Sequence, residues 1–350
     1  MRGEMKGPTM NALYSLLAVL AMVLAGIAGG QSEPARVALA TFIPYAAFAT
    51  LLVGFCWRVV RWALAPVPFH IPVTCGQQQS LPWIRSAKID NPSTRWGVVS
   101  RMAAEILLFR SLFRNSRARL SGGRLILGDS AGLWLCSLAF HWALLLILLR
   151  HLRLFLEPVP AFVNALDRLD GYFQIGVPPL YLSDVILVGA LAYLLFRRFR
   201  DPALRYLSLF SDYFALFLLL AIAATGILMR YFTRVDILSV KQFALSMAAF
   251  QPRAPQALGS LFLCHLLLVC ALATYFPFSK LMHMGGVFLS PTRNLANNSR
   301  SRRHINPWNA PVKTHTYAEW EKEFRDRMQT AGIPLETENE TEDAGHARTN

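Results

Sequence analysis

Acidic residues and paired cysteines are both scarce in this sequence. Only 21 of its 350 residues are Asp or Glu, and no carboxylate lies between Asp129 and Glu157 or between Asp236 and Glu319. The five cysteines form no CxxC pair and no CxxCH motif. The chain therefore lacks the spacing that holds an iron–sulfur cluster or a covalently attached haem. Its long carboxylate-free stretches are also unsuited to a proton relay of Asp and Glu side chains.

Hydrophobic residues are abundant instead. They make up 54% of the chain, and only 16% of the residues are charged. A segment of roughly 20 apolar residues can cross a bilayer, and it must be helical because lipid offers no partner for backbone groups. We therefore predict an all-α integral membrane protein with a bundle of about six transmembrane helices. The six segments are residues 11–29, 38–60, 131–152, 183–196 (short), 207–229 and 258–280.

The basic residues set the expected orientation. With the N-terminus in the cytoplasm, 27 of the 35 lysines and arginines fall on the cytoplasmic side, as the positive-inside rule favours. Both termini are then cytoplasmic, and the net charge of +14 is mainly a topology signal, since no nucleic-acid-binding motif accompanies it. The first segment also resembles a cleavable signal peptide, which is the alternative reading of residues 1–30. Four regions follow: helices in 1–60, a cytoplasmic loop in 61–128, a four-helix core in 129–283 and a tail in 284–350.

Four histidines lie in or at the ends of the third and sixth predicted helices. His141 and His151 are ten residues apart, about 15 Å along a helix, and His265 and His283 are eighteen apart, about 27 Å. Because the two helices run in opposite directions, His141 should lie level with His283 inside, and His151 level with His265 outside. Pro277 should kink or end the sixth helix before His283 and absorb much of the mismatch.

Several kinds of site could explain such pairs of histidines. One intramembrane histidine alone is often structural, and a zinc site needs more Cys, Asp or Glu ligands than lie nearby. Haem fits better, because it is flat, apolar and held by axial histidines. The cations that could meet its propionates, or simply reach toward the interface, are Arg61, Arg150, Arg153 and Lys280. A transporter or a cofactor-free anchor is the alternative from another class.

These motifs carry a resemblance to a known family. The stretches "HWALLLILLRH" and "HLLLVCALATYFPFSKLMH" resemble the gamma chain of respiratory nitrate reductase. The stretches "TCGQQQSLPWI" and "NPWNAPVKTHTYAEWEKEFRDRMQTAGIPLE" resemble the narrower DsrM family, the cytochrome b subunits of DsrMKJOP complexes. The resemblance implies two haem b groups between the third and sixth helices, one with iron ligands His141 and His283 inside and one with His151 and His265 outside.

The resemblance also implies a role and partners. It implies an electron-transfer subunit of a quinol-linked oxidoreductase complex in the inner membrane, using menaquinone or menaquinol. Its partners would be a cytoplasmic iron–sulfur subunit related to heterodisulfide reductases and other membrane and periplasmic subunits, in sulfur or sulfite metabolism. A cytochrome b of a nitrate or heterodisulfide reductase is the alternative. The gamma chain has a lysine near its quinol site where this sequence has Gly171, so that site does not transfer by matching.

The outer loop 153–184 supplies candidates for a quinol site, because a quinol that loses two protons needs acceptors within hydrogen-bond reach. The titratable candidates there are Asp167, Asp170, Tyr172 and Asp184. A solvated loop is the simpler interpretation of each residue.

Two cytoplasmic segments have amphipathic patterns. In the loop, Val98, Met102, Ile106, Phe109 and Phe113 form one stripe with arginines mostly off it, which predicts a helix on the inner leaflet or against a partner. In the same loop, His70 and Cys75 are candidate ligands without further partners, and we interpret them as structural.

The tail carries the second pattern. Thr316 and Glu319 form a capping box, which predicts a helix from Tyr317 that Gly332 and Pro334 close. Its apolar stripe predicts docking on the iron–sulfur subunit, with the membrane surface as the alternative. The polar end after Glu336 is expected to be disordered.

Overall fold

The computed structural model describes residues 6–65, 70–71, 76–115, 117–121, 123–128, 130–174, 178–252, 258–298, 300 and 314–336. These belong to two units, residues 1–303 and 304–350, and each is described by itself.

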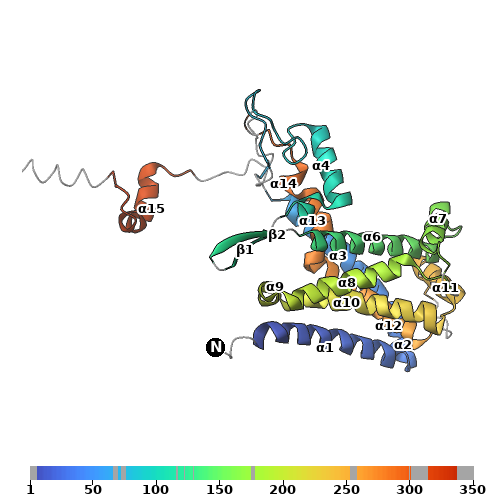
Figure 1. Ribbon diagram of the computed structural model, residues 1–350. Helices are drawn as coiled ribbons and strands as arrows, with labels where there is room; N and C mark the ends of the chain where they lie inside the picture. The colour runs from blue at the N-terminus through green and yellow to red at the C-terminus, as the bar shows by residue number, and fades with distance from the viewer. Residues whose placement is uncertain are drawn as a thin grey trace, which may run out of the picture. The chain divides into compact units, whose positions relative to one another are not determined.

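In the part of the first unit that the structure describes, long helical segments occupy all six positions that the sequence predicted as spans (Figure 1). Five of these described segments are long and apolar enough to cross a membrane, one fewer than expected. The exception is α8, whose last turn carries Arg197, Arg198 and Arg200. The segments are α1 (Lys6–Gly29); α2 (Glu33–Val37), η1 (Ala38–Phe42) and α3 (Ile43–Ala63) in one run; α6 (Ala131–His151); α8 (Leu182–Arg200); α10 (Phe210–Ile227) with η3 (Leu228–Thr233); and α12 (Ser260–Tyr275).

Small residues bring α1 and α12 into close contact. A Cβ on Gly26 would lie 2.6 Å from the Cα of Cys264, and a Cβ on Gly30 would lie 2.7 Å from the Cα of Ser260. Glycines four residues apart share one helix face, the small-xxx-small pattern that lets membrane helices approach each other. The first segment therefore packs closely on α12.

The core lies around α10 and α12. Leu218, Cys264 and Leu268 are fully buried between these helices and α1. A second cluster joins α6, α8 and α10 through Ala143, Leu191 and Leu219. The helix pairs that pack closely are α6 with α8, α1 with α10 and α12, α3 with α12, and α10 with α8 and α12.

The sixth segment is broken at its proline, as expected. The helix α12 ends at Tyr275, and the 3-10 turn η4 (Phe276–Phe278) contains Pro277. A second 3-10 turn, η5 (Lys280–Met282), leads into α13 (His283–Leu289). His283 therefore begins a new helix, which removes the need for a straight 27 Å separation from His265.

The loop between the second and third spans departs from the sequence prediction. A single amphipathic helix was expected, but α4 (Arg95–Leu108) ends at Phe109, which has φ 50° and ψ 46°, and the short α5 (Arg110–Phe113) follows. An antiparallel hairpin of β1 (Arg117–Ser121) and β2 (Arg124–Gly128) comes next and pairs Ser121 with Arg124. Gly123, with φ +78°, lies in the turn of this hairpin. The alternation in "RARLSGGRLILG" carries the strand signal.

Residues of the predicted tail pack on this loop. The backbone N–H of Asn297 donates to the carbonyl of Pro92 at 2.7 Å, and Arg293 forms an ion pair with Glu105 at 3.0 Å. The helix α14 (Pro291–Asn294) contacts α4. The described residues of 70–115 and 290–298, here called the α4 module, thus form one packed region.

The two ends of the bundle are distinct in Figure 1. The end that the sequence assigns to the cytoplasm, here called the inner end, carries α9 (Pro202–Leu207), α13 and the hairpin. The outer end carries η2 (Leu152–Leu154), α7 (Ala161–Asp170) and α11 (Ile237–Ala248).

The second unit contains α15 (Tyr317–Thr330), where the predicted capping box is confirmed. The hydroxyl of Thr316 accepts from the N–H of Glu319 at 3.3 Å, and the Glu319 carboxylate accepts from the N–H of Thr316 at 3.0 Å. The ring of Trp320 lies next to those of Tyr317 and Phe324 in tilted contacts, at centroid distances of 6.0 and 5.6 Å. The residues after Glu336 lie outside the described part of the chain.

Candidate haem and quinol sites

The structure brings together the predicted inner pair of histidines. The ring centroids of His141 and His283 lie 5.9 Å apart, with the ring planes at 83°. Phe109 and Phe140 contact the His141 ring edge-on, at 4.9 and 4.6 Å. Phe109 comes from the sharp break after α4, so the α4 module covers this pair.

The predicted cations near the inner pair already have partners. Lys280 forms an ion pair with Asp212 at 2.8 Å and is largely exposed. Arg61 is exposed and lies over the ring of Trp57 at 5.5 Å. The Nε of Arg58, one turn earlier on α3, is buried without a hydrogen-bond partner among the described residues. Sequence reasoning did not single out Arg58.

The outer pair lies between α6 and α12. His151 is the last residue of α6, and His265 lies in the second turn of α12. Nδ1 of His265 is 2.8 Å from the hydroxyl of Thr225 on α10. That hydroxyl donates to the carbonyl of Ala221 at 2.9 Å, so it accepts from His265.

All four histidines share one hydrogen-bond pattern that suits a bound metal. Nδ1 of His141 lies 2.7 Å from the Ser137 carbonyl, Nδ1 of His151 lies 2.7 Å from the Ile147 carbonyl, and Nδ1 of His283 lies 2.8 Å from the Lys280 carbonyl. An imidazole whose Nδ1–H is held in this way presents a neutral Nε2 to a metal, which is the usual arrangement for metal-ligating histidines.

The distance between the rings of His141 and His283 is also the one expected for two imidazoles that bind the same metal. With metal–nitrogen bonds of about 2 Å, the centroids of two axial imidazoles lie about 6 Å apart, close to the observed separation. The helices α6 and α12 are not among the closely packed pairs of described helices. The residues present therefore fit a flat prosthetic group held between the two helices.

Charged residues that the sequence assigned to separate roles form one cluster beside His151. Arg150 forms an ion pair with Asp170 at 3.1 Å, and their side chains are only 8% and 1% exposed. Arg150 also approaches Asp184 at 3.5 Å, and Arg153 pairs with Asp167 at 3.2 Å. Both predicted propionate partners at the outer end are thus engaged by aspartates.

A tyrosine lies at the centre of this cluster. The ring of Tyr181 lies between Arg150 and Arg230, whose guanidinium carbons are 3.6 and 3.7 Å from its centroid. Its hydroxyl donates to Asp167 at 2.6 Å. Burial, together with this bond, raises the pKa of Tyr181, so it keeps its proton near neutral pH. The hydroxyl of Tyr231 donates to Asp184 at 2.8 Å.

Sequence reasoning missed Tyr181, Arg230 and Tyr231. A signal was present for Arg230, which directly follows the predicted span 207–229. The apolar helix of the structure continues past it to Thr233, and an ionisable residue in such a helix is energetically costly.

The predicted quinol-site residues differ in exposure and in the hydrogen bonds that they already make. Asp170 is buried and accepts from both the N–H and the hydroxyl of Ser183, at 2.8 and 2.6 Å, so it is fully committed. Tyr172 is 73% exposed and contacts Phe173. Asp184 is partly exposed and lies 3.5 Å from Arg150, the residue before His151.

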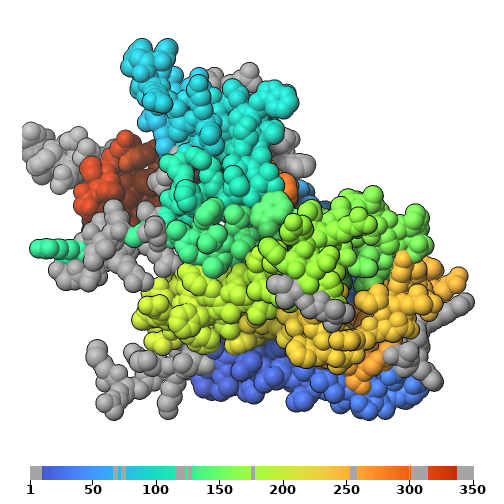
Figure 2. Space-filling model, turned by 45° about the vertical axis from the view of Figure 1, so that its right-hand side comes forward, coloured from blue at the N-terminus to red at the C-terminus, as the bar shows by residue number. Residues whose placement is uncertain are grey.

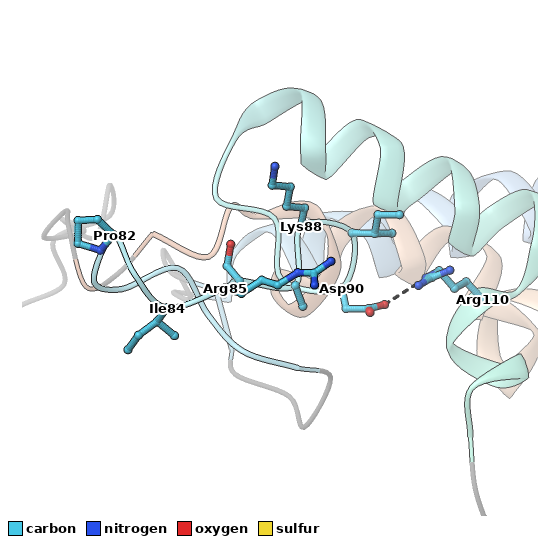
Figure 3. Close-up of a pocket in the computed structure, with 9 residues that line it drawn as sticks. Pro82, Ile84, Arg85, Lys88, Asp90 and Arg110 are labelled. Atoms are coloured by element: carbon cyan, nitrogen blue, oxygen red, sulfur yellow. Dashed lines mark hydrogen bonds and ion pairs between the residues drawn. The ribbon is translucent and has the colours of Figure 1, made fainter.

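A separate open pocket of about 670 Å³ lies in the α4 module (Figure 3). Arg85, Lys88 and Arg110 give it an excess of positive charge, with Asp90 as the one carboxylate among its lining residues. Burial alone would raise the pKa of Asp90, but hydrogen bonds from Arg110 and Arg114 hold it below its usual value. His70 is buried nearby and bonds to Arg101 at 3.2 Å, whereas Cys75 lies outside the described residues.

Comparison with known proteins identifies the family of the chain. The nitrate reductase gamma subunit family matches residues 95–301. The chain is 44% identical over 273 residues to the Hdr-like menaquinol oxidoreductase cytochrome b-like subunit of Archaeoglobus fulgidus, covering 76% of this chain and 82% of the relative. The subunit of the same description from Archaeoglobus profundus is 44% identical over 274 residues, covering 76% and 81%. The chain thus belongs to the nitrate reductase gamma subunit family.

Proposed function

We propose that this chain is a diheme cytochrome b that transfers electrons between menaquinone in the membrane and a cytoplasmic iron–sulfur subunit. One observation carries the proposal: two histidine pairs, each contributed by α6 and by α12 or α13, have Nδ1 held by an oxygen and Nε2 left for a metal. The relatives' description as cytochrome b-like subunits of menaquinol oxidoreductases supports the same role.

The chain's own residues would position the two haems and protect them from water. His141 and His283 would hold the inner haem, and His151 and His265 the outer one. The haems, when bound, would supply reversible one-electron chemistry across the membrane. Phe109 and Phe140 would shield the inner ligand.

Alanine substitution of each histidine tests the ligand assignment. Variants His141→Ala and His283→Ala should lose the inner haem, and His151→Ala and His265→Ala the outer one, as read from haem content and the reduced visible spectrum. His315→Ala, on the exposed side of the tail unit, is the control and should keep both haems. The pairing is wrong if His141→Ala and His265→Ala lose the same haem. A wild-type chain without reducible haem bands would favour a transporter or a cofactor-free anchor.

We place quinol oxidation at the outer end, with Asp184 as the preferred proton acceptor. Asp170 is buried, accepts from Ser183 and forms an ion pair with Arg150, whereas Asp184 is partly exposed and lies 3.5 Å from Arg150, the residue before His151. Asp184→Asn should slow haem reduction by a menaquinol analogue in vesicles, while Asp201→Asn, at the helix cap of α9, should leave it unchanged. If only substitutions at the inner end slow the reaction, quinol is oxidised on the other face.

The identity of the soluble partner rests on sequence resemblance. The loop and tail motifs favour a DsrMKJOP-type complex in sulfur metabolism, and the alternative is a nitrate or heterodisulfide reductase. Purification of the complex from its host membranes, followed by identification of its subunits, separates these assignments. A subunit with iron–sulfur clusters and a heterodisulfide reductase-like sequence is the expected result.

A further inference from the structure

The helix α4 turns a different face outward from the one its sequence stripe predicts. Trp96 and Val99 are 81% and 56% exposed, Leu107 is 48% exposed, and Ala103 is exposed between them. These residues lie at spacings of three and four and form one continuous face of the helix. This set is here called the outer face of α4.

Polar side chains of α4 point into the module instead. Arg101 is 7% exposed and bonds to the ring of buried His70, and Glu105 pairs with Arg293. Burial, with the nearby Arg101 charge, lowers the pKa of His70, so this interior holds a neutral imidazole. A helix with polar residues inside and apolar residues outside is inverted relative to a water-exposed helix.

The last turn of α4 lies against a membrane span. The indole N–H of Trp134 donates to the Leu108 carbonyl at 2.7 Å, and that of Trp142 donates to the Leu107 carbonyl at 3.1 Å. Both tryptophans belong to α6. The point midway between them lies about 10 Å along the helix from its first residue, Ala131, at 1.5 Å per residue. The carbonyls at a helix end need partners wherever water is absent, and the two indoles supply them.

The outer face adjoins the exposed apolar surface of α6, a candidate membrane span. The exposed side of α6 carries Leu135, Trp142, Leu145 and Leu148, the outward residues of an apolar span. Leu107 adjoins Trp142 through the hydrogen bond just described. Figure 1 shows α4 running across the direction of α6, and Figure 2 shows its module projecting from the side of the bundle. With the bundle axis perpendicular to the membrane, α4 therefore lies along the membrane plane.

We propose that α4 lies within the inner leaflet, with its outer face against phospholipid acyl chains. A level about 10 Å along α6 agrees with the depth of about 5–10 Å at which in-plane helices lie. Exposed Arg95 next to Trp96 would meet anionic headgroups, and tryptophan favours this interface. The lipid-facing residues are therefore Trp96, Val99, Ala103 and Leu107, rather than the stripe of Val98, Met102 and Ile106.

Spin labels on the full-length chain test the proposal. The chain is placed in vesicles of phosphatidylethanolamine and phosphatidylglycerol, with Cys56, Cys75 and Cys136 replaced by Ser. Labels at residues 99, 103 and 107 are compared with a lipid-facing reference at 145 and a polar reference at 77, by collision with oxygen and with a water-soluble nickel chelate. The oxygen-to-nickel ratio at the three α4 sites should match that at 145 and exceed that at 77 several-fold.

Two results would overturn the proposal. Ratios like that at residue 77 would place the outer face in water, and exclusion of both reagents in native membranes that hold the whole complex would place a protein partner on it. Each labelled variant must retain the visible spectrum of the parent chain. If a cysteine variant fails to fold, quenching by brominated phospholipid in the parent, compared with Trp96→Phe, gives the same answer: loss of the quenched component supports lipid contact, and its persistence contradicts it.

Discussion

At the scale of single residues, the hydrogen bond that Nδ1 of each histidine makes would determine how strongly its Nε2 binds a metal. Three of the histidines use a carbonyl of their own helix or turn, and only His265 depends on another helix, through Thr225. A hydrogen bond that Nδ1–H donates to an oxygen raises the basicity of a metal-bound imidazole. If His265 binds the proposed outer haem, Thr225 is the residue through which α10 would tune that haem.

Replacement of Thr225 by Val should leave both haems bound but raise the midpoint potential of the outer one. A less basic ligand stabilises the oxidised iron less, and one hydrogen bond corresponds to a shift of a few tens of millivolts. A redox titration followed by visible absorption measures the shift. Thr233→Val, at an exposed hydroxyl of η3, is the matched control. An unchanged potential in Thr225→Val would show that this bond does not act on the ligand.

The buried His70 predicts a pH effect on the α4 module. Its pKa is lowered in the folded chain by burial and by Arg101, so between that lowered pKa and the ordinary value near 6.5 the unfolded chain binds more protons. The free energy of unfolding should therefore be independent of His70 protonation above about pH 6.5. Below that pH it should decrease, because protonation of His70 favours the unfolded chain. Thermal unfolding at pH 7.5 and 5.5 should show a smaller loss in His70→Gln than in the parent. Equal losses in the two chains would exclude His70 as the source.

Sequence reasoning at the scale of residues reached the inner histidine pair but missed the long-range contacts. Opposite helix directions, together with the expected break at Pro277, predict that His141 lies beside His283, and their ring centroids are 5.9 Å apart. The cluster around Tyr181 could not be found this way, because Arg150, Asp167 and Arg230 converge from three different elements. The sequence offered each as an isolated charge, and only the fold shows that they neutralise one another.

At the scale of elements, apolar length predicted the spans, but local pattern misjudged α4. Hydropathy finds a span because lipid requires a helix there. The stripe of Val98, Met102 and Ile106 was equally periodic, yet the fold buries Arg101 and Glu105 because His70 and Arg293 pair with them from distant segments. A periodic pattern shows that a helix has two faces without showing which face is outward.

The close packing of α1 on α12 predicts sensitivity to one methyl group. In Gly26→Ala the new Cβ meets the Cys264 backbone at 2.6 Å, so the helices must separate. Overpacking of this kind costs about 1–3 kcal/mol, which should lower the apparent unfolding temperature in detergent. Gly189→Ala, on a surface of α8 with no atom within 4 Å, should be neutral or stabilising by up to about 1 kcal/mol. Equal effects of the two substitutions would mean that α1 does not pack as described.

At the scale of the whole molecule, the tail unit and the membrane bundle are expected to have separate functions. The capped helix α15 exposes Tyr317 and Trp320, while Glu319, Glu323 and Asp326 would be repelled by an anionic leaflet. Aromatic anchors on a short helix are a common way to bind a groove on a partner. We therefore expect α15 to hold the iron–sulfur subunit.

A chain truncated after Pro311 should retain both haems and their spectrum but lose the soluble subunit on purification from its host. The haem-site residues all precede the cut, and the first unit ends at residue 303, so the bundle should not depend on the tail. The full-length variant Trp320→Ala with Phe324→Ala should weaken the same association, and Lys322→Ala, an exposed cation on the same helix, is its control. The subunit ratio of each preparation, measured beside its haem content, gives the answer. A truncated chain that still binds the subunit at full occupancy would assign α15 to the membrane surface instead.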